Sequence, residues 1–444
     1  MNRPARTALS ASLVLLLLSL AVILMPPVED LSQQADAHIL KADDGKQWYR
    51  GNLHTHSLWS DGDDYLEMIG VWYRDRDYDF LCFTDHNTLA TSRDRWIDIS
   101  KKPTGKDAYE KLKKRFSDGW VEERTTDGKT EVRLKTYEEV VSKIAIPDEF
   151  LLIQGEEVTD RFGRLPVHLC ATNIKELIPP LHGESVAATI DNNVNALIAQ
   201  RERTGQPMFI HLNHPNFGYG VTAEDLMRVR GEKFFEVYNG HPGVNNSGDP
   251  QHASTERIWD IILTKRLAEF GMSVMYGLAT DDGHNYHEIP SRKSEPGRGW
   301  VMVLAENLKA GTLVEAMERG DFYSSSGVNL AKVISSPKGL DVEVLEEKGV
   351  TYRIDFVGTR AGYDPESKPV LDAKGEEVNA TRLYSADIGR TFKTVNGTKA
   401  SYQFSGDELY VRAIVTSTKK HPNPSEVGEF ERAWAQPVVG PAAR

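Results

Sequence analysis

Two histidines near the amino end of the chain have the spacing of a metal site. His54 and His56 flank Thr55 in an extended Asn-Leu-His-Thr-His run. Side chains of a strand alternate between its two faces, so both imidazoles project from the same side and can reach one ion. Asp61 follows in a Ser-Asp-Gly turn, where Gly62 lets the backbone fold back toward the same point. Two nitrogen ligands and one oxygen ligand thus converge.

Further potential ligands stand where apolar runs of the sequence end. Together with the first three they form a set of nine: His54, His56, Asp61, His86, Glu157, His168, His214, Asp282 and His284. Neutral imidazoles and carboxylates are ligands of divalent zinc, manganese and iron, and nine exceed what one ion can use. We therefore expect two or three clustered divalent metal ions (Zn, Mn or Fe).

The segments that position these residues alternate between strand and helix patterns. A strand at 51–56, a helix at 64–75 and a strand at 78–84 predict a βαβ unit with parallel pairing. The ligands stand at strand ends, where α/β barrels and open sheets carry their sites. Further strands and helices follow at 150–154, 166–172, 185–206, 207–210, 234–239, 273–279, 299–305 and 309–319. About seven such units predict an α/β fold, a distorted (β/α)7 barrel over residues 41–330.

Two other regions differ in character from this pattern. A polar insertion at 101–146 contains two predicted helices, at 106–116 and 137–146, and a hairpin turning at Asp127-Gly128. It is either a lid over the site or a surface decoration. Beyond about residue 326, period-two alternation without intervening helices predicts a small antiparallel β-sandwich, an accessory domain over 331–444.

Composition and charge narrow the class of partner. The 444 residues are 40% hydrophobic and 27% charged, as in an ordinary globular protein, and the formal net charge is −12. That charge disfavours a nucleic-acid partner held by electrostatics, so a small molecule is the expected substrate. Cys82 and Cys170 are too few for a disulfide scaffold and are predicted to be buried free thiols.

Residues 1–40 have the pattern of an export signal. Arg3 and Arg6 precede an apolar run at 9–25, which resembles a secretory h-region, and 35–37 offers a small-x-small cleavage site. Cleavage and retention as an N-terminal signal anchor in the membrane both remain open. In either case the folded part is expected outside the cytoplasm, periplasmic or extracellular.

The nine residues, in their order along the chain, resemble the PHP (polymerase and histidinol phosphatase) family of metal-dependent hydrolases. The motifs that carry the resemblance span roughly residues 48–330 and are His54-Thr55-His56, Asp61, Asp85-His86, Gly155-Glu156-Glu157, His168, His214-Pro215 and Asp282-Gly283-His284. The chain is also similar to the exported CehA/McbA-like branch through residues 279–284, 297–301 and 433–437. The family registers favour Glu157 over Glu156, and Asp282 over Asp281.

The resemblance implies a hydrolase in which Glu157 bridges two ions. Clustered divalent ions lower the pKa of a shared water to about 7. Leaving-group protonation needs an acid, for which His284, Asp282, His241 and His287 remain alternatives. The expected catalytic set is therefore His284, Asp282 and Glu157, and Arg298 is a predicted substrate-binding residue.

Three functions are weighed. The first is a phosphoesterase, the second a carboxyl-ester or carbamate hydrolase, and the third a non-catalytic metal-binding envelope protein. A complete ligand set disfavours the third. An amidohydrolase barrel also opens with His-x-His, but it would place a bridging lysine where this chain has Gly155-Glu156-Glu157.

Overall fold

The computed structural model describes residues 38–40 and 45–444; the predicted cleavage site and nearly all of the predicted signal lie outside them. The protein is of the mixed α/β type, with one large sheet and few helices. The strands of this sheet, in hydrogen-bonded order, are β11 (Tyr276–Thr280), β10 (Phe234–Asn239), β9 (Phe209–Leu212), β8 (Leu165–Thr172), β7 (Leu151–Phe162), β3 (Phe80–Phe83), β2 (Gln47–Asn52), β12 (Trp300–Ala305), β13 (Phe322–Ser325), β22 (Phe430–Val439), β21 (Glu408–Lys420), β16 (Tyr352–Arg360) and β19 (Arg390–Asn396).

The predicted βαβ unit is confirmed. Strand β2 leads through helix α1 (Leu66–Arg74) to β3, which pairs parallel to it, and β7 is parallel to β3. Strands β9, β10 and β11 are also parallel. Between these two parallel groups, β8 is antiparallel to both β7 and β9. Only two residues join β7 to β8, which is too short for a parallel crossover.

The large sheet curls, so that β11 at one end of the hydrogen-bonded order lies against β12, β13 and β22. The carbonyl of Gly277 in β11 accepts hydrogen bonds from Ser324 Oγ of β13, at 2.8 Å, and from Gln436 Nε2 of β22, at 3.0 Å. The interior of the curl is filled by apolar side chains of β7 to β13. The carboxyl ends of β2, β3, β9 and β11 consequently approach one another.

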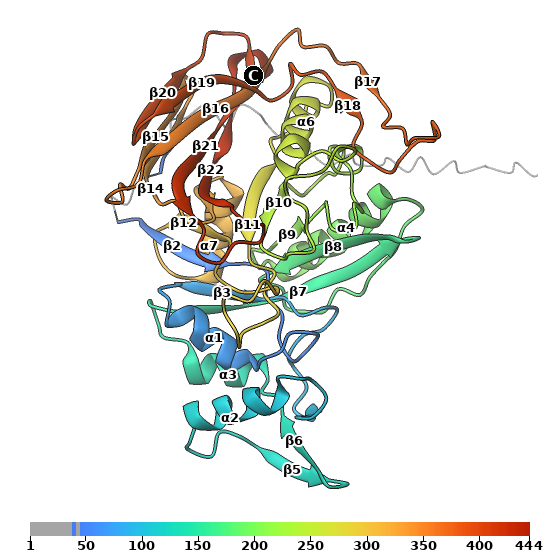
Figure 1. Cartoon of the computed structure of the whole chain (residues 1–444), viewed down its shortest axis with the longest axis vertical. Helices are drawn as coiled ribbons and strands as arrows, with labels where there is room; N and C mark the ends of the chain where they lie inside the picture. The colour runs from blue at the N-terminus through green and yellow to red at the C-terminus, as the bar shows by residue number, and fades with distance from the viewer. Residues whose placement is uncertain (1–37, 41–44) are drawn as a thin grey trace, which may run out of the picture.

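Helices cover the outside of this curled sheet (Figure 1). Helix α4 (Val186–Thr204) lies against β7, β8 and β9, while α7 (Ala310–Glu318) lies against β12. A short helix, α5 (Ala223–Leu226), contacts α4 and α6 (Thr255–Ala268). The sequence did not indicate α6. This helix is buried on nearly all sides because it lies between β10 and the strands β16 and β21, so it lacks a polar stripe.

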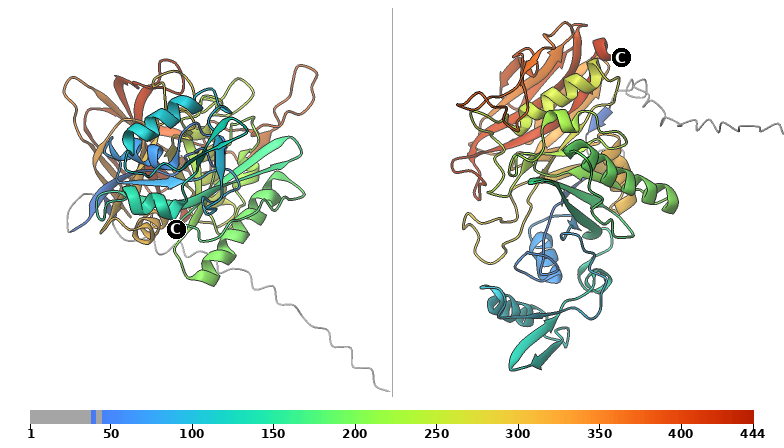
Figure 2. Two further views of the ribbon diagram at one scale, coloured as in Figure 1. Left: turned by 90° about the horizontal axis from the view of Figure 1, so that it is seen from below. Right: turned by 90° about the vertical axis from the view of Figure 1, so that its right-hand side faces the viewer.

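The insertion at 101–146 forms a lobe at the opposite end of the molecule from the chain's carboxyl terminus (Figure 1). Its helices are α2 (Gly105–Arg115) and α3 (Tyr137–Ile144), and its strands are β5 (Glu123–Thr126) and β6 (Lys129–Arg133); β4 (Trp96–Asp98), just before the insertion, pairs with β6. The predicted hairpin is confirmed: β5 and β6 are antiparallel, and Asp127 and Gly128 both have positive φ, as a type I′ turn requires. Figure 2 shows the lobe projecting from the body.

The carboxyl-terminal region contains the predicted antiparallel strands. A sheet of β1 (His38–Leu40), β14 (Leu330–Ser336), β15 (Gly339–Val344) and β20 (Lys399–Gln403) packs through a shared apolar core on β16, β21 and β22. Two further short strands, β17 (Ser367–Lys368) and β18 (Leu383–Tyr384), pair with each other, and a 3-10 turn (Pro441–Ala443) ends the chain. Because β13 pairs with β22, the large sheet is continuous across residue 330.

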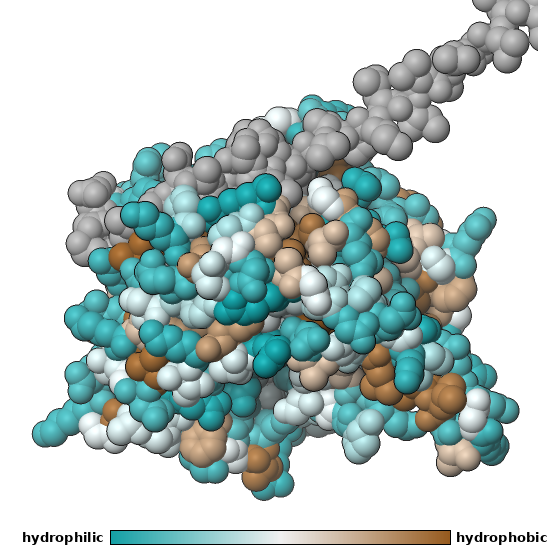
Figure 3. Space-filling model, turned by 90° about the horizontal axis from the view of Figure 1, so that it is seen from above, coloured by the Kyte–Doolittle hydropathy of each residue, from teal (hydrophilic) through white to brown (hydrophobic). Residues whose placement is uncertain are grey.

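Seen from the top of Figure 1, the protein surface is mostly hydrophilic and carries small, separate hydrophobic spots (Figure 3). Among the described residues, no helix combines the length and the hydrophobicity needed to cross a membrane.

Candidate metal centre

The loop after β2 carries the first two candidate ligands and is tied into the curl of the sheet. The amide of His56 donates to the carbonyl of Gly283, at 3.0 Å, and thereby joins the β2 end to the β11 end. Asn52 Nδ2 donates to the carbonyl of His54 and to Thr55 Oγ1. The His-x-His segment is therefore held by the ends of two strands that lie far apart in the sequence.

All nine predicted ligand residues lie in four overlapping groups whose ligand atoms are within 4.8 Å of one another. The groups are His56–Asp61–His86–His284, His54–His56–Glu157, His54–His214–Asp282 and Glu157–His168–His214. Each group shares at least one member with another, so the nine side chains form one continuous cluster. Two of the nine, His214 and Asp282, have positive φ, of 23° and 50°. Such strained backbone at a non-glycine residue is typical of functional sites.

The centre of the cluster has the donor set and spacing that a divalent cation needs. His54 Nε2 lies 3.5 Å from Glu157 Oε2 and 3.3 Å from Asp282 Oδ1, while His56 Nε2 lies 3.3 and 3.1 Å from the same two oxygens. Ligand atoms about 2.1 Å from one ion are separated by roughly 3.0–3.4 Å in tetrahedral or octahedral geometry. Within the described residues, both Nε2 atoms and Glu157 Oε2 are buried without a hydrogen-bond partner. Buried polar atoms left in this way fit a bound metal.

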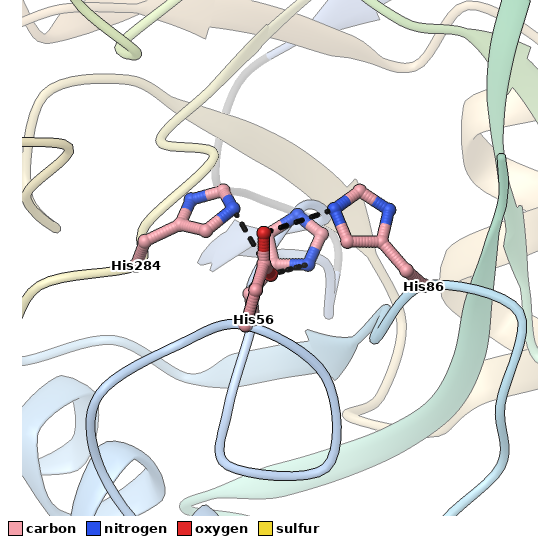
Figure 4. Close-up of side chains that lie close together, drawn as sticks. His56, His86 and His284 are labelled. Atoms are coloured by element: carbon pink, nitrogen blue, oxygen red, sulfur yellow. Dashed lines mark ion pairs between the residues drawn. The ribbon is translucent and has the colours of Figure 1, made fainter. Parts of the chain in front are cut away.

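The outer group surrounds the carboxylate of Asp61. Its oxygens lie 3.3 Å from His284 Nε2, 3.5 Å from His86 Nε2 and 3.7 Å from His56 Nδ1. Figure 4 shows His284 and His86 on opposite sides of His56, with dashed lines marking the ion pairs of this group. Burial raises the pKa of Asp61, but the hydrogen bonds of His284 and His86 outweigh it and lower that pKa below its ordinary range. The turn depends on Gly62, where a Cβ would lie 2.4 Å from the carbonyl oxygen of His56.

Glu157 links the remaining groups. Its Oε1 lies 3.1 Å from His168 Nδ1 and 3.4 Å from His214 Nε2, while its Oε2 faces His54, His56 and His86. Burial alone would raise the pKa of Glu157, but the charges of the surrounding imidazoles hold it well below the ordinary value. Because each oxygen of the ionised Glu157 carboxylate faces a different set of histidines, the carboxylate is suited to bridge two cations.

The neighbouring alternatives point away from the cluster. Glu156 Oε2 accepts the amide hydrogen of Ile178 at 2.9 Å, on the other face of β7. Asp281 accepts from Tyr73 Oη and from the amides that follow residue 297. Strand alternation therefore puts Glu157 in the cluster, and the positive φ of Asp282, just after the end of β11, accompanies its turn toward the same cluster, as the sequence registers indicated.

Known proteins give the following likenesses. No protein-family model matches the sequence, and no curated protein is significantly similar to it. A two-domain Bacteroides vulgatus protein containing a predicted PHP-like metal-dependent phosphoesterase is 13% identical, with a TM-score of 0.38 over 87% of this chain and 95% of its own. A Bifidobacterium adolescentis protein described as a candidate metal-dependent phosphoesterase is 15% identical, with a TM-score of 0.29 over 61% and 96%. TM-scores this low do not establish a common fold, so the metal centre itself must carry the functional conclusion.

Glu236 is a part of the centre that the sequence did not single out. It lies in β10, is fully buried, and accepts from His54 Nδ1 at 2.7 Å and from Thr280 Oγ1 at 2.7 Å. Its other oxygen accepts from the amide of His214 and from Asn239 Nδ2. The signal that could have found it is a lone acidic residue in an apolar run, because a charge is rarely buried without partners.

Two candidate acids differ in the state of their ring nitrogens. His241 Nδ1 accepts the amide hydrogen of Gly243 at 2.9 Å, so a neutral His241 carries its proton on Nε2, and its ring centroid lies 5.5 Å from that of His284. His287 Nε2 instead donates to the carbonyl of Asp63, and its Nδ1 faces Lys111 Nζ at 3.4 Å. Of these two, His241 is the residue with a free donor beside the cluster.

The placement of Arg298 argues against the predicted substrate contact. The side chain is fully buried, and its guanidinium donates to the carbonyl oxygens of Gly240 and Asn423 and to Glu295 Oε2. These donors are committed to protein acceptors, so Arg298 joins the loop after β11 to the carboxyl-terminal region. The loop composition alone could not show this, because Asn423 is remote in the sequence.

Proposed function

We propose that the protein is a metal-dependent phosphoesterase that holds two or three divalent cations, Zn, Mn or Fe. The observation that carries the proposal is the sharing of Glu157, His54, His56 and His214 between overlapping ligand groups. A structural metal site is closed around one ion, whereas a continuous cluster with ionised carboxylates at its centre suits catalysis by adjacent ions.

The chain's own residues divide the work by position. When bound, divalent ions at such a centre supply Lewis-acid polarisation of the ester and a water molecule of lowered pKa. Glu157 and Asp282, which lie within 3.5 Å of His54 and His56, would help hold the ions and neutralise part of their positive charge. His241 is placed to donate its Nε2 proton to the departing oxygen, and His284 is held by a hydrogen bond from Nδ1 to the carbonyl of Asp282, at 2.8 Å.

The finer assignments belong to the same proposal. The chain is a PHP-like hydrolase of the CehA/McbA-like branch, with a distorted (β/α)7 barrel over 41–330 and a β-sandwich over 331–444. It is exported, acts on a small-molecule ester in the periplasm or outside the cell, and either loses residues 1–40 or remains anchored by them. What supports the family is the order and convergence of the nine residues.

A panel of chromogenic esters tests the function. Protein loaded with manganese or zinc is assayed on nitrophenyl phosphate, bis-nitrophenyl phosphate and nitrophenyl acetate, with metal content measured in parallel. We expect phosphoester turnover that a chelator abolishes and that H54A lowers by about 10³-fold or more, because the centre loses a ligand. The matched control is H252A, since His252 stacks on Tyr219 and pairs with Asp249 outside the four groups. Turnover of the acetate alone would favour the carboxyl-ester alternative, and none with any metal the non-catalytic one.

A further inference from the structure

A hollow of about 480 Å³ opens beside the metal centre at the β7–β8 hairpin. Its lining residues are Thr159, Asp160, Arg161, Arg164, Pro166, His168, Pro180 and His182. Two of them belong to the centre or support it. His168 is in a ligand group with Glu157, and Thr159 Oγ1 lies 2.5 Å from His86 Nδ1. The hollow is therefore continuous with the place where an ester would react.

Strand register puts a cation at a defined distance from the centre. Glu157, Thr159 and Arg161 alternate along β7, so their side chains leave the strand on the same face. Four residues of strand separate the Cα atoms of Glu157 and Arg161 by about 13 Å. Arg164 lies in the turn that follows, next to Gly163 with φ of 60°. Both guanidinium groups thus extend from one end of the hollow.

The two arginines have no partners of their own. Between residues 45 and 444, neither guanidinium has a hydrogen-bond or ion-pair partner, and both side chains are exposed. The one acidic residue in the lining, Asp160, is already used. Its oxygens accept from the amides of Arg161 and His182 and from Asn193 Nδ2, and His182 Nδ1 lies 2.5 Å from Oδ1. Two free positive charges therefore face the hollow in a protein whose formal net charge is −12.

We propose that Arg161 and Arg164 form a subsite for a second anionic group of the substrate, a phosphate or a carboxylate. This rests on the proposed phosphoesterase function: the reacting phosphoryl group lies at the metal centre, and the second anion lies along β7 in the hollow. The planar guanidinium group binds phosphate and carboxylate oxygens through paired hydrogen bonds. The substrate class is accordingly a phosphomonoester that carries a further negative group on its organic part.

Three esters that differ in this second group test the subsite. Phosphate release is measured from fructose 1,6-bisphosphate, 3-phosphoglycerate and glycerol 3-phosphate, in which the second anion is a phosphate, a carboxylate and absent, respectively. The proteins are wild type, R161A/R164A, and R203A/R390A as the matched control. Arg203 and Arg390 are exposed and pair with their own acids, Glu176 and Asp387, so the control removes the same charge elsewhere.

The expected result is a selective loss. R161A/R164A should lower kcat/KM for one or both doubly anionic esters about 10- to 100-fold, mostly through KM, because charge-assisted hydrogen bonds are lost. Its effect on glycerol 3-phosphate should stay within about threefold, as should all effects of R203A/R390A. The doubly anionic ester whose kcat/KM falls more in R161A/R164A identifies the second group as a phosphate or a carboxylate. Equal losses on all three esters, or no loss on any, would overturn the subsite.

Failure of the subsite and failure of the phosphoesterase function give different results. If the wild type hydrolyses glycerol 3-phosphate but shows no Arg161- and Arg164-dependent preference, only the subsite is wrong. If no ester is turned over, calorimetric binding of fructose 1,6-bisphosphate to the same three proteins replaces the rate. A dissociation constant raised about tenfold or more by R161A/R164A alone then supports the anion subsite; an unchanged constant refutes it.

Discussion

Glu236 and His54 form a hydrogen bond of 2.7 Å in which neither side chain is accessible to solvent. Burial raises the pKa of Glu236, but the charge of His54 and the hydrogen bonds of the two neighbouring histidines lower it below its ordinary range. An ionised carboxylate can only accept, so His54 donates from Nδ1. When the ring is neutral, as a metal ligand must be, its Nε2 lone pair then faces Glu157 and Asp282, which is the tautomer that metal binding needs.

Replacing Glu236 by glutamine should weaken metal binding without unfolding the protein. Glutamine keeps the shape of the side chain, but its amide can donate to Nδ1 and so favour the opposite tautomer of His54. We expect the metal dissociation constant of E236Q to rise about 10- to 100-fold. Metal titration against a competing chelator measures the change, and circular dichroism checks the fold.

The matched control for that substitution is E156Q. Glu156 is also buried in the large sheet, but its carboxylate accepts from Ile178 and faces away from the cluster. E156Q should bind metal as the wild type does. Equal weakening in both variants would mean that any buried carboxylate lost from this sheet disturbs the centre, and that Glu236 has no special part in it.

The lobe at 101–146 is expected to hold the Asp61 turn in place. Lys102 Nζ donates to the carbonyls of Asp61 and Gly62, and Lys111 of α2 pairs with Asp64. K102M removes the donor and keeps most of the side chain's length, so the turn should loosen. An ion bound beside Asp61 should then be lost at several-fold lower chelator concentration. K101M is the control, because Lys101 is exposed and its side chain makes no hydrogen bond or ion pair within the described chain.

Local patterns predicted well the elements that have one polar and one apolar side. Helix α1 and the β5–β6 hairpin lie where periodicity and turn residues indicated. The nine candidate ligands could be collected because each ends an apolar run, and the structure brings all of them together. Their role as metal ligands stays a prediction, since proximity alone does not bind an ion.

What the sequence could not show depends on contacts between distant segments. Helix α6 is enclosed by β10, β16 and β21, so its polar residues Asp260, Lys265 and Arg266 are buried together with its apolar ones, and its sequence has no amphipathic helical pattern. The hydrogen bond of Glu236 to His54 joins residues 182 positions apart, so the sequence around Glu236 does not reveal it. One acceptor of the Arg298 guanidinium is likewise Asn423, far along the chain. No local periodicity records such pairings.

Stability should depend on pH through Glu67 of α1. Burial raises the pKa of Glu67 to about 7, although Trp120 Nε1 donates to its carboxylate at 2.9 Å. The folded state thus holds this proton more tightly than the unfolded state, and stability is lost as pH rises from the unfolded pKa through 7. E67Q removes the titration and keeps an acceptor for Trp120. Between pH 5.5 and 8, its stability relative to the wild type should rise by roughly 2 kcal/mol.

Urea unfolding at the two pH values measures that difference. E138Q, at an exposed position of α3, is the control and should follow the wild type at both. A wild type and an E67Q protein whose stabilities change in parallel with pH would show that the Glu67 carboxyl group keeps an ordinary pKa in the folded state.

A buried ion pair should make the carboxyl-terminal strands unfold together with the rest of the protein. Arg412 of β21 donates from Nε and Nη2 to the two oxygens of Asp260 in α6, at 2.8 and 2.7 Å, and both side chains are buried. R412M leaves the Asp260 carboxylate buried without its cation, which should cost about 3–5 kcal/mol. D260N/R412M leaves no such charge and should cost less than R412M alone.

Urea unfolding followed by tryptophan fluorescence should therefore show one transition that R412M shifts as a whole, because α6 also packs on β10. If R412M instead split the curve and displaced only one part of it, the strands after residue 330 would be an independently folding domain.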